Sequence, residues 1–113
     1  MSTKVKVVNL SGEVVLSTLE EHRARIVAAL NERSTVLASL SQTEDIDLFG
    51  VQLLYAARRY ADQKGREFHL TGEVPEPVAR RLYETGFSGS VLRDGRELDQ
   101  QLHEFGTKVN NDA

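Results

Sequence analysis

Two short segments at the start of the chain combine alternating and apolar positions in a way that is typical of β-strands. Residues 4–10 read Lys-Val-Lys-Val-Val-Asn-Leu, with one wetter face, and residues 13–16 form a second extended run. Ser11 and Gly12 separate the two runs. Because a Ser-Gly pair between extended runs is typical of a tight reversal, the pattern predicts a β-hairpin at the beginning of the fold.

The period of the pattern then changes to that of a helix. Apolar residues at helical spacing predict a first helix over residues 19–31. Residues 35–40 are mostly apolar and rich in β-forming residues, as in a strand covered on both faces, and the polar residues 41–45 are interpreted as a connection. The helical period returns over residues 48–64, where Asp47 is placed to cap the N-terminus of a second long helix.

The last third of the chain repeats this alternation more weakly. Residues 66–70 predict a strand, and two prolines open a helix that ends at Gly86. The apolar pair at residues 91–92 is interpreted as a short edge strand. Three residues at helical spacing predict a final amphipathic helix: Leu98, Leu102 and Phe105.

These elements follow the order β-β-α-β-α-β-α, with a further strand and helix as an optional continuation. The order predicts an α/β fold: a mixed sheet of four to five strands that starts with the hairpin, together with three to four helices. A chain of 113 residues is about one domain's worth. We therefore expect a single domain over residues 1–106 and a flexible, polar C-terminal tail over residues 107–113.

Composition excludes several classes of protein and indicates a cellular compartment. Charged residues make up 27% of the chain and hydrophobic residues 40%, which excludes a wholly disordered chain. No apolar stretch approaches the roughly 20 residues of a membrane span, and no signal peptide is visible. The net charge of −3 argues against nucleic acid as a partner. The absence of cysteine excludes disulfides and fits a reducing compartment, so we expect a cytoplasmic protein.

The sequence shows no constellation that would support catalysis. It lacks a phosphate-binding glycine loop, a dinucleotide fingerprint and a nucleophile elbow. The histidines stand on different predicted elements without metal-ligand spacing, and each is expected at the surface or its boundary: His22, His69 and His103. We therefore expect no enzyme activity, no metal and no cofactor.

An acidic cluster and two arginine pairs have alternative interpretations. Glu44, Asp45 and Asp47 could hold Mg²⁺ through their carboxylates, but a solvated loop followed by a helix cap is favoured. The pairs at residues 58–59 and 80–81 could bind an acidic partner, but solvated helix faces are favoured for both.

One junction combines several features of an interaction site. Asp47, Leu48, Phe49 and Gly50 lie where the connection from a buried strand meets the start of the long helix. Helix N–H groups, the positive end of the dipole and a small glycine coincide there, so that a partner could approach closely. Leu48 and Phe49 form an apolar patch if both are exposed, whereas Phe49 would be ordinary core if it folds onto the sheet.

Several motifs occur together in a characteristic order. They are the turn at residues 10–13, the strand at 35–40, D-x-x-G-V-Q-L-L at 47–54, Lys64-Gly65 before a strand, and L-Y-E-T-G-F at 82–87. In this order they resemble the STAS domain, the fold of anti-sigma factor antagonists and of the cytoplasmic tails of sulfate transporters. The resemblance runs from about Val5 to Phe87.

The resemblance implies a regulatory module that binds a protein partner, such as an anti-sigma kinase or a sensory protein, in bacterial partner switching. In relatives that act as phosphorylation switches, the residue after the matching aspartate is a serine or threonine that a kinase phosphorylates. Here Leu48 occupies that position and carries no hydroxyl, so no phosphorylation is expected there. The predicted partner-binding residues are Asp47, Leu48, Phe49 and Gly50, with Ser11 and Gly12 flanking them through the resemblance.

Two other functions remain open. Some small STAS proteins are accessory subunits that bind the ATPase of lipid-transporting ABC transporters, which would place this chain in a membrane-associated complex without insertion into the lipid. Weak nucleotide binding has also been suggested for the class, and its surface here would combine residues 47–50 with residues 71–73. The sequence leaves the oligomeric state open.

Overall fold

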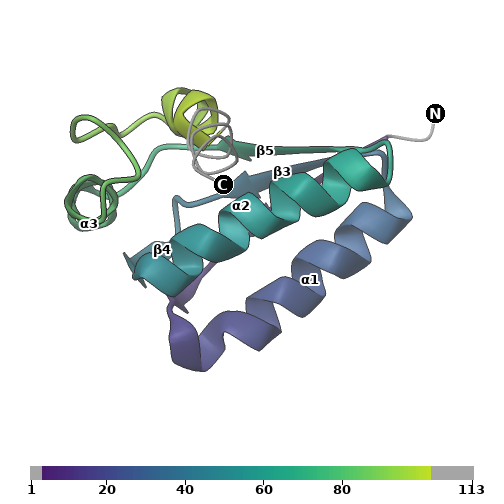
Figure 1. The fold of residues 1–113 in the computed structure, drawn as a ribbon, viewed down its shortest axis with the longest axis horizontal. Helices are drawn as coiled ribbons and strands as arrows, with labels where there is room; N and C mark the ends of the chain where they lie inside the picture. Colours follow the sequence, from purple (N-terminus) through teal and green to yellow (C-terminus); the bar gives the residue numbers. More distant parts are fainter. Residues whose placement is uncertain (1–3, 103–113) are drawn as a thin grey trace, which may run out of the picture.

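The computed structural model describes residues 4–102, which form an α/β fold (Figure 1). In chain order the elements are β1 (Val5–Asn9), β2 (Gly12–Val14), the 3-10 turn η1 (Leu16–Thr18), α1 (Leu19–Glu32), β3 (Thr35–Ser39), β4 (Thr43–Ile46), α2 (Leu48–Gln63), β5 (Glu67–Thr71) and α3 (Glu76–Glu84). Residues 95–102 are also helical. The predicted α/β class and the alternation of strands and helices are confirmed.

The strands form two parallel sheets. One has the order β1-β3-β5 and the other pairs β2 with β4. Helices α1 and α2 lie on one side of the three-stranded sheet (Figure 1). Val8, Val36 and Phe68 point from the sheet into the core that these helices cover. The alternation predicted for the strands therefore separates a buried face from a more exposed one.

The predicted β-hairpin is wrong. β1 pairs in parallel with β3, from Val5 beside Thr35 to Asn9 beside Ser39, and β2 pairs in parallel with β4. The Leu10 N–H donates to the Ser39 carbonyl and the Gly12 N–H to the Gln42 carbonyl, so the chain keeps its direction through residues 10–12. Gly12 has a φ of +77° and supplies a bend along a continuing path rather than a reversal.

The sheets are also less mixed than expected. Every pairing between named strands in the described residues is parallel, and the antiparallel contribution is an isolated bridge between Glu73 and Asp94. Residues 91–92, interpreted as an edge strand, form no strand. Residues 43–46, most of which were expected in a loop, form β4 instead, where the buried Thr43 hydroxyl donates to the Leu10 carbonyl at 2.6 Å.

The helices agree better with the sequence pattern. Gly65 (φ +68°) and Gly86 (φ +84°) follow the ends of α2 and α3, as predicted for left-handed residues at helix C-termini. Leu98 and Leu102 are fully buried on the helix at residues 95–102. Phe105, the domain boundary at residue 106 and the tail at 107–113 lie outside the described residues.

His22 lies in the core rather than at the surface or its boundary, where it was expected. Its side chain is almost completely buried on α1, and its Nε2 lies 2.8 Å from the Glu13 carbonyl oxygen. Because a carbonyl only accepts, Nε2 must carry the proton that it donates to Glu13. The histidine therefore fastens α1 to β2.

Candidate functional site

The carboxylate of Asp47 organises the junction between β4 and α2. Its Oδ1 accepts the Gly50 N–H at 2.9 Å, which confirms Asp47 as the N-cap. Its Oδ2 accepts the Leu16 N–H at 3.1 Å. A single side chain thus satisfies the first turn of α2 and holds η1 beside it.

Gly50 allows α2 to begin directly against β2. A Cβ at this position would lie 2.2 Å from the Val14 carbonyl oxygen and 2.7 Å from Cγ1 of Ile46. Gly50 is buried, so the close approach that it permits is to the chain's own backbone. In this geometry the glycine fixes the position of Leu48 and Phe49.

Three large apolar side chains are exposed around Asp47. Leu48 is 48% exposed and Phe49 44%, so Phe49 is not folded into the core. Leu16, which the sequence analysis placed in an extended run, is 59% exposed and lies beside Asp47 through its main-chain hydrogen bond. We call Leu16, Leu48 and Phe49 the apolar patch.

Ser11 and Gly12 lie at the other end of the β2–β4 pair. Gly12 stands beside Thr43, the first residue of β4, whereas Asp47 directly follows the last. Four residues of strand span about 13 Å at roughly 3.3 Å per residue. The structure therefore brings Asp47, Leu48 and Phe49 together with Leu16, and separates Ser11 and Gly12 from them.

The two strands that lead to the apolar patch carry acidic side chains. Glu13 and Glu44 are exposed on β2 and β4. Arg81 of α3 is ion-paired to Asp45 through two contacts of 3.2 Å, and its hydrogen bond lowers the pKa of the Asp45 carboxyl. Because that arginine is already paired with Asp45, it leaves the negative charges of Glu13 and Glu44 on these two strands unneutralised.

The acidic cluster has structural partners rather than a shared ligand. Asp45 binds Arg81, Asp47 caps α2, and no group of three or more metal-ligating side chains is found among the described residues. Thr43 is buried and its hydroxyl is already used as a donor, which makes it unsuitable as a substitute phosphate acceptor.

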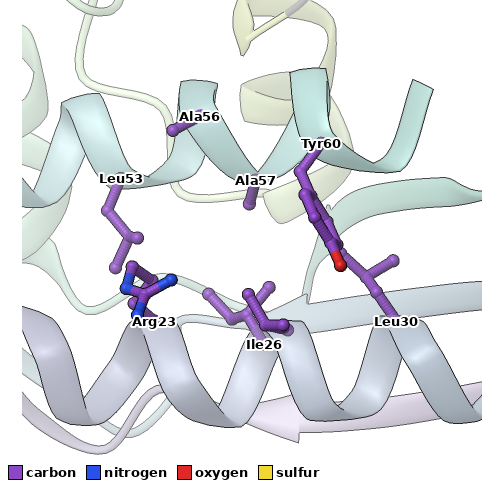
Figure 2. A pocket seen from close by; sticks show the side chains of 8 residues that line it. Arg23, Ile26, Leu30, Leu53, Ala56, Ala57 and Tyr60 are labelled. Atoms are coloured by element: carbon purple, nitrogen blue, oxygen red, sulfur yellow. The ribbon is translucent and has the colours of Figure 1, made fainter. Parts of the chain in front are cut away.

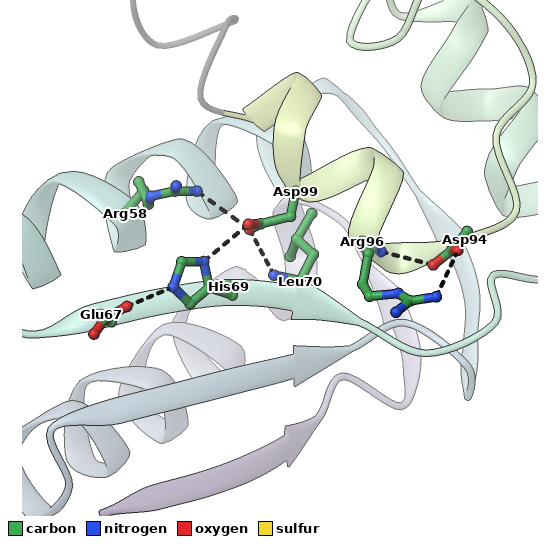
Figure 3. A network of polar contacts seen from close by, with 7 residues as sticks. All are labelled: Arg58, Glu67, His69, Leu70, Asp94, Arg96 and Asp99. Atoms are coloured by element: carbon green, nitrogen blue, oxygen red, sulfur yellow. Dashed lines mark hydrogen bonds and ion pairs between the residues drawn. The ribbon is translucent and has the colours of Figure 1, made fainter.

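A second polar cluster lies between β5 and the helix at residues 95–102 (Figure 3). The Asp99 carboxylate accepts from the Leu70 N–H at 2.8 Å and from Nη1 of Arg58 at 3.2 Å, and it lies 2.9 Å from Nδ1 of His69. Nε2 of His69 lies 3.0 Å from a Glu67 carboxylate oxygen. Arg58, expected on a solvated face, is thus mostly buried in an ion pair.

Two opposing effects, burial and hydrogen bonding, set the pKa of His69. Burial acts to lower the pKa of His69, but the hydrogen bonds to Glu67 and Asp99 outweigh it, and the pKa lies above its ordinary value. Through these contacts the cluster connects β5, α2 and the helix at residues 95–102 (Figure 3).

A groove of about 400 Å³ separates α1 from α2 (Figure 2). Ile26 and Leu30 face Leu53 and Ala57 across it. Arg23 at its rim is bonded to Glu20 at 2.6 Å. The groove therefore presents apolar walls without a converging set of reactive groups.

No helix within the described residues combines the length and the apolar composition that crossing a membrane requires.

Comparison with known proteins places the chain in a family. The family model described as "Mlab, STAS domain" matches residues 1–94. No curated protein matches the sequence. Because the family model covers more than half of the chain, it identifies the family directly, and the predicted STAS resemblance is confirmed.

Solved structures share the fold. The anti-sigma factor antagonist SpoIIAA in its unphosphorylated form is similar with a TM-score of 0.59 and 22% identity, over 76% of each chain. A structure described as that of Mglu is similar with a TM-score of 0.57 and 18% identity, over 69% of this chain. The chain spans only 19% of Mglu. The structural matches support the same architecture, and the chain belongs to the Mlab family of STAS domains.

Proposed function

We propose that this chain is a non-enzymatic regulatory module that docks a protein partner through the apolar patch. The observation that carries the proposal is the exposure of Leu48 and Phe49 at the start of a rigidly capped helix. Adjacent large apolar side chains in water are typical of an interaction surface. The similarity of the fold to an anti-sigma factor antagonist supports a protein as the partner.

The patch would act as a permanent docking surface. Leu48 carries no hydroxyl, so it cannot receive the phosphate that would add about −1.5 to −2 charges at the start of α2. The partner's own state would then determine when binding occurs. The acidic side chains on the strands that lead to the patch favour a partner that is apolar at the centre of its contact and basic at the rim.

The residues have distinct roles in this proposal. Leu16, Leu48 and Phe49 supply apolar contacts, and Asp47 holds them in place while offering part of its charge. Gly50 acts through positioning because it is buried. Ser11 and Gly12 would take part only in an interface large enough to extend along the β2–β4 pair.

Replacement of one patch residue tests the proposal. Tagged wild-type chain, Leu48→Asp and the control Val91→Asp would be used for affinity purification from the native host, with quantitative mass spectrometry of the recovered proteins. Val91 is also an exposed apolar residue but lies outside the patch. We expect recovery of the partner to fall at least tenfold for Leu48→Asp alone. Equal recovery with all three chains would contradict the proposal.

The alternative is an accessory subunit that binds the ATPase of a lipid-transporting ABC transporter. The absence of a phosphate acceptor at Leu48 fits this function equally well, because a constitutive subunit needs no reversible release. The same purification distinguishes the two functions. An ATPase recovered together with a permease supports the accessory subunit, whereas a kinase or sigma-binding protein supports the signalling module.

Nucleotide binding at the start of α2 is less well supported by the geometry. The Gly50 N–H, one of the groups that would face an anion, already donates to the Asp47 carboxylate. A second negative charge beside that carboxylate would be repelled. Titration with GTP or ATP, followed by NMR chemical shifts of residues 47–50 and 71–73, is therefore expected to show no saturable change.

A further inference from the structure

Strand β1 is an open edge of the three-stranded sheet. It pairs with β3 and with no other described strand. The Thr35 N–H donates to the Lys4 carbonyl at 2.9 Å and the Leu10 N–H to the Ser39 carbonyl at 3.0 Å. Because main-chain groups alternate in direction along a parallel strand, the even-numbered residues bond to β3, and the N–H and C=O groups of Val5 and Val7 point outward.

The side chains at this edge are apolar and exposed. Val5 is 45% exposed and Val7 53%, while the intervening Val8 is buried. Because side chains alternate along a strand, Val5 and Val7 lie on the sheet face opposite to Val8, which is buried in the core. Leu37 of β3 lies beside Val7 and is only half-buried, so the apolar surface continues inward from the edge.

The usual protections of an edge strand are weak here. Exposed edges are commonly blunted by proline, by a bulge or by free lysines. β1 contains no proline, and its pairing with β3 keeps an unbroken register from Val5 to Asn9. Nζ of Lys6 is bonded to Glu32 of α1 at 3.2 Å, which holds that charge on the helix-covered face.

We propose that β1 pairs antiparallel with β1 of a second copy of this chain, about a two-fold axis at Val7. The outward-facing main-chain N–H and C=O groups of Val5, Val7 and Asn9 then pair with C=O and N–H groups of the same strand in the second copy. Val7 faces Val7 and exchanges two hydrogen bonds with it, and Val5 faces Asn9. The Asn9 carbonyl already accepts from Arg25 at 2.8 Å, and its second lone pair can accept from Val5.

Charge selects this register over its neighbour. With Val7 at the axis, Lys6 of one copy faces Val8 of the other. A shift of the axis to Lys6 would set the two Lys6 residues directly opposite each other, and like charges in that position are destabilising. The strand is thus complementary to itself in the Val7 register, which favours a second copy over an unrelated extended peptide as the occupant.

The opposite edge of the sheet explains why pairing would stop at two copies. On β5 the Leu70 N–H already donates to the Asp99 carboxylate at 2.8 Å, so the helix at residues 95–102 covers that edge. A two-fold contact through β1 uses the same surface on both copies and closes on itself. The result is a six-stranded sheet in a dimer rather than a filament.

The test begins with the mass of the full chain in solution, measured by sedimentation equilibrium up to millimolar concentration. We expect a monomer–dimer equilibrium that Val7→Lys weakens at least tenfold and that Val91→Lys leaves unchanged. Circular dichroism of each variant checks that the exposed substitution leaves the fold intact. Leu48→Asp should also leave the dimer unchanged, because this inference does not rest on the proposed docking function. A chain that stays monomeric over this range overturns the proposal.

Cysteine cross-linking then tests the register, since the chain contains no cysteine of its own. In a dimer centred on Val7, the two Val7 Cα atoms lie about 5.5 Å apart, which a disulfide can span. The two Val5 residues lie about 13 Å apart, four residues along the strand at roughly 3.3 Å each, which it cannot. Oxidation should link Val7→Cys and not Val5→Cys. Linkage of Val5→Cys alone, or of neither variant, overturns the proposed pairing.

Discussion

The N-terminal parts of α2 and of the helix at residues 95–102 share two features but present different surfaces. Each has a glycine pressed against strand backbone in its first turn: Gly50, the third residue of α2, lies against Val14, and Gly95, the first residue of the other helix, lies against Thr71. Each also has an aspartate that accepts a main-chain N–H from a neighbouring segment: Asp47, the N-cap of α2, binds Leu16, and Asp99, in the second turn of the other helix, binds Leu70.

The difference lies in what surrounds each aspartate. Asp99 contacts Arg58 and His69, so its charge is paired within the fold. Asp47 is surrounded by Leu16, Leu48 and Phe49, which are left in water. Similar contacts can therefore serve only the fold in one place and also hold an exposed apolar surface in another. That contrast is the reason to seek function at Asp47.

The largest effects are expected where the two junctions are alike, at their glycines. Gly50→Ala and Gly95→Ala would each place a Cβ within 2.4 Å of a strand carbonyl oxygen that cannot move independently. We expect each to lower the free energy of unfolding by about 3 kcal/mol, as for a strongly overpacked site. Urea denaturation measures this loss. Gly89→Ala, which meets nothing within 4 Å, is the control and should change stability by less than about 0.5 kcal/mol.

The two aspartates should differ in their importance for stability. Asp99→Ala removes the acceptor of three contacts in a mostly buried site, and we expect a loss of about 3 kcal/mol. Asp47→Ala removes an N-cap and one further bond, for which about 1 kcal/mol is expected. Thermal and urea unfolding of both variants give the comparison, with the exposed Asp62→Ala as a neutral reference. An equal loss at both sites would show that the two junctions are energetically equivalent.

Sequence reasoning captured the features that are encoded locally. It predicted Asp47 as a cap and Gly65 and Gly86 as helix ends, all of which depend on neighbours within one or two turns. It left open whether Phe49 is exposed or folds onto the sheet, and the structure leaves this side chain 44% exposed. The family resemblance, which was inferred from local motifs, is confirmed by the family model that matches residues 1–94.

The errors arose where partners are distant in sequence. Ser11-Gly12 has the chemistry of a turn, but the hydrogen bond from Leu10 to Ser39 decides that the chain bends instead of reversing. β4 shows no clear alternation, because Thr43 is buried through a bond to Leu10 and not through its hydrophobicity. Leu16 and the cluster at Asp99 were missed for the same reason: their contacts span about thirty residues, and no spacing rule connects them.

The pH dependence of stability should separate the two junctions further. The hydrogen bonds to Glu67 and Asp99 keep the pKa of His69 above its unfolded value of about 6.5, although burial opposes them. A raised folded pKa means that protonated His69 stabilises the fold fully below the unfolded pKa, and that this contribution is lost as the pH rises through the folded pKa.

We therefore expect the free energy of unfolding to fall by less than about 1 kcal/mol as the pH rises from 6 to 8, the range for a partly exposed ion pair. Urea denaturation at both pH values measures the change. His69→Gln should remove most of this slope, whereas Asp47→Asn should leave it in place. A slope that persists in His69→Gln would assign the titration to another group.

The smallest effect on stability is expected at the position with the largest expected effect on binding. Leu48 is half exposed, so its replacement by aspartate forfeits little burial, and the favourable interaction of the new charge with the dipole of α2 offsets its repulsion from Asp47. The free energy of unfolding of Leu48→Asp should stay within about 0.5 kcal/mol of the wild-type value. If urea denaturation shows a larger loss, Leu48 supports the fold and reduced partner recovery would lose its meaning. If stability is retained while binding is lost, Leu48 contributes to the contact with the partner and not to the fold.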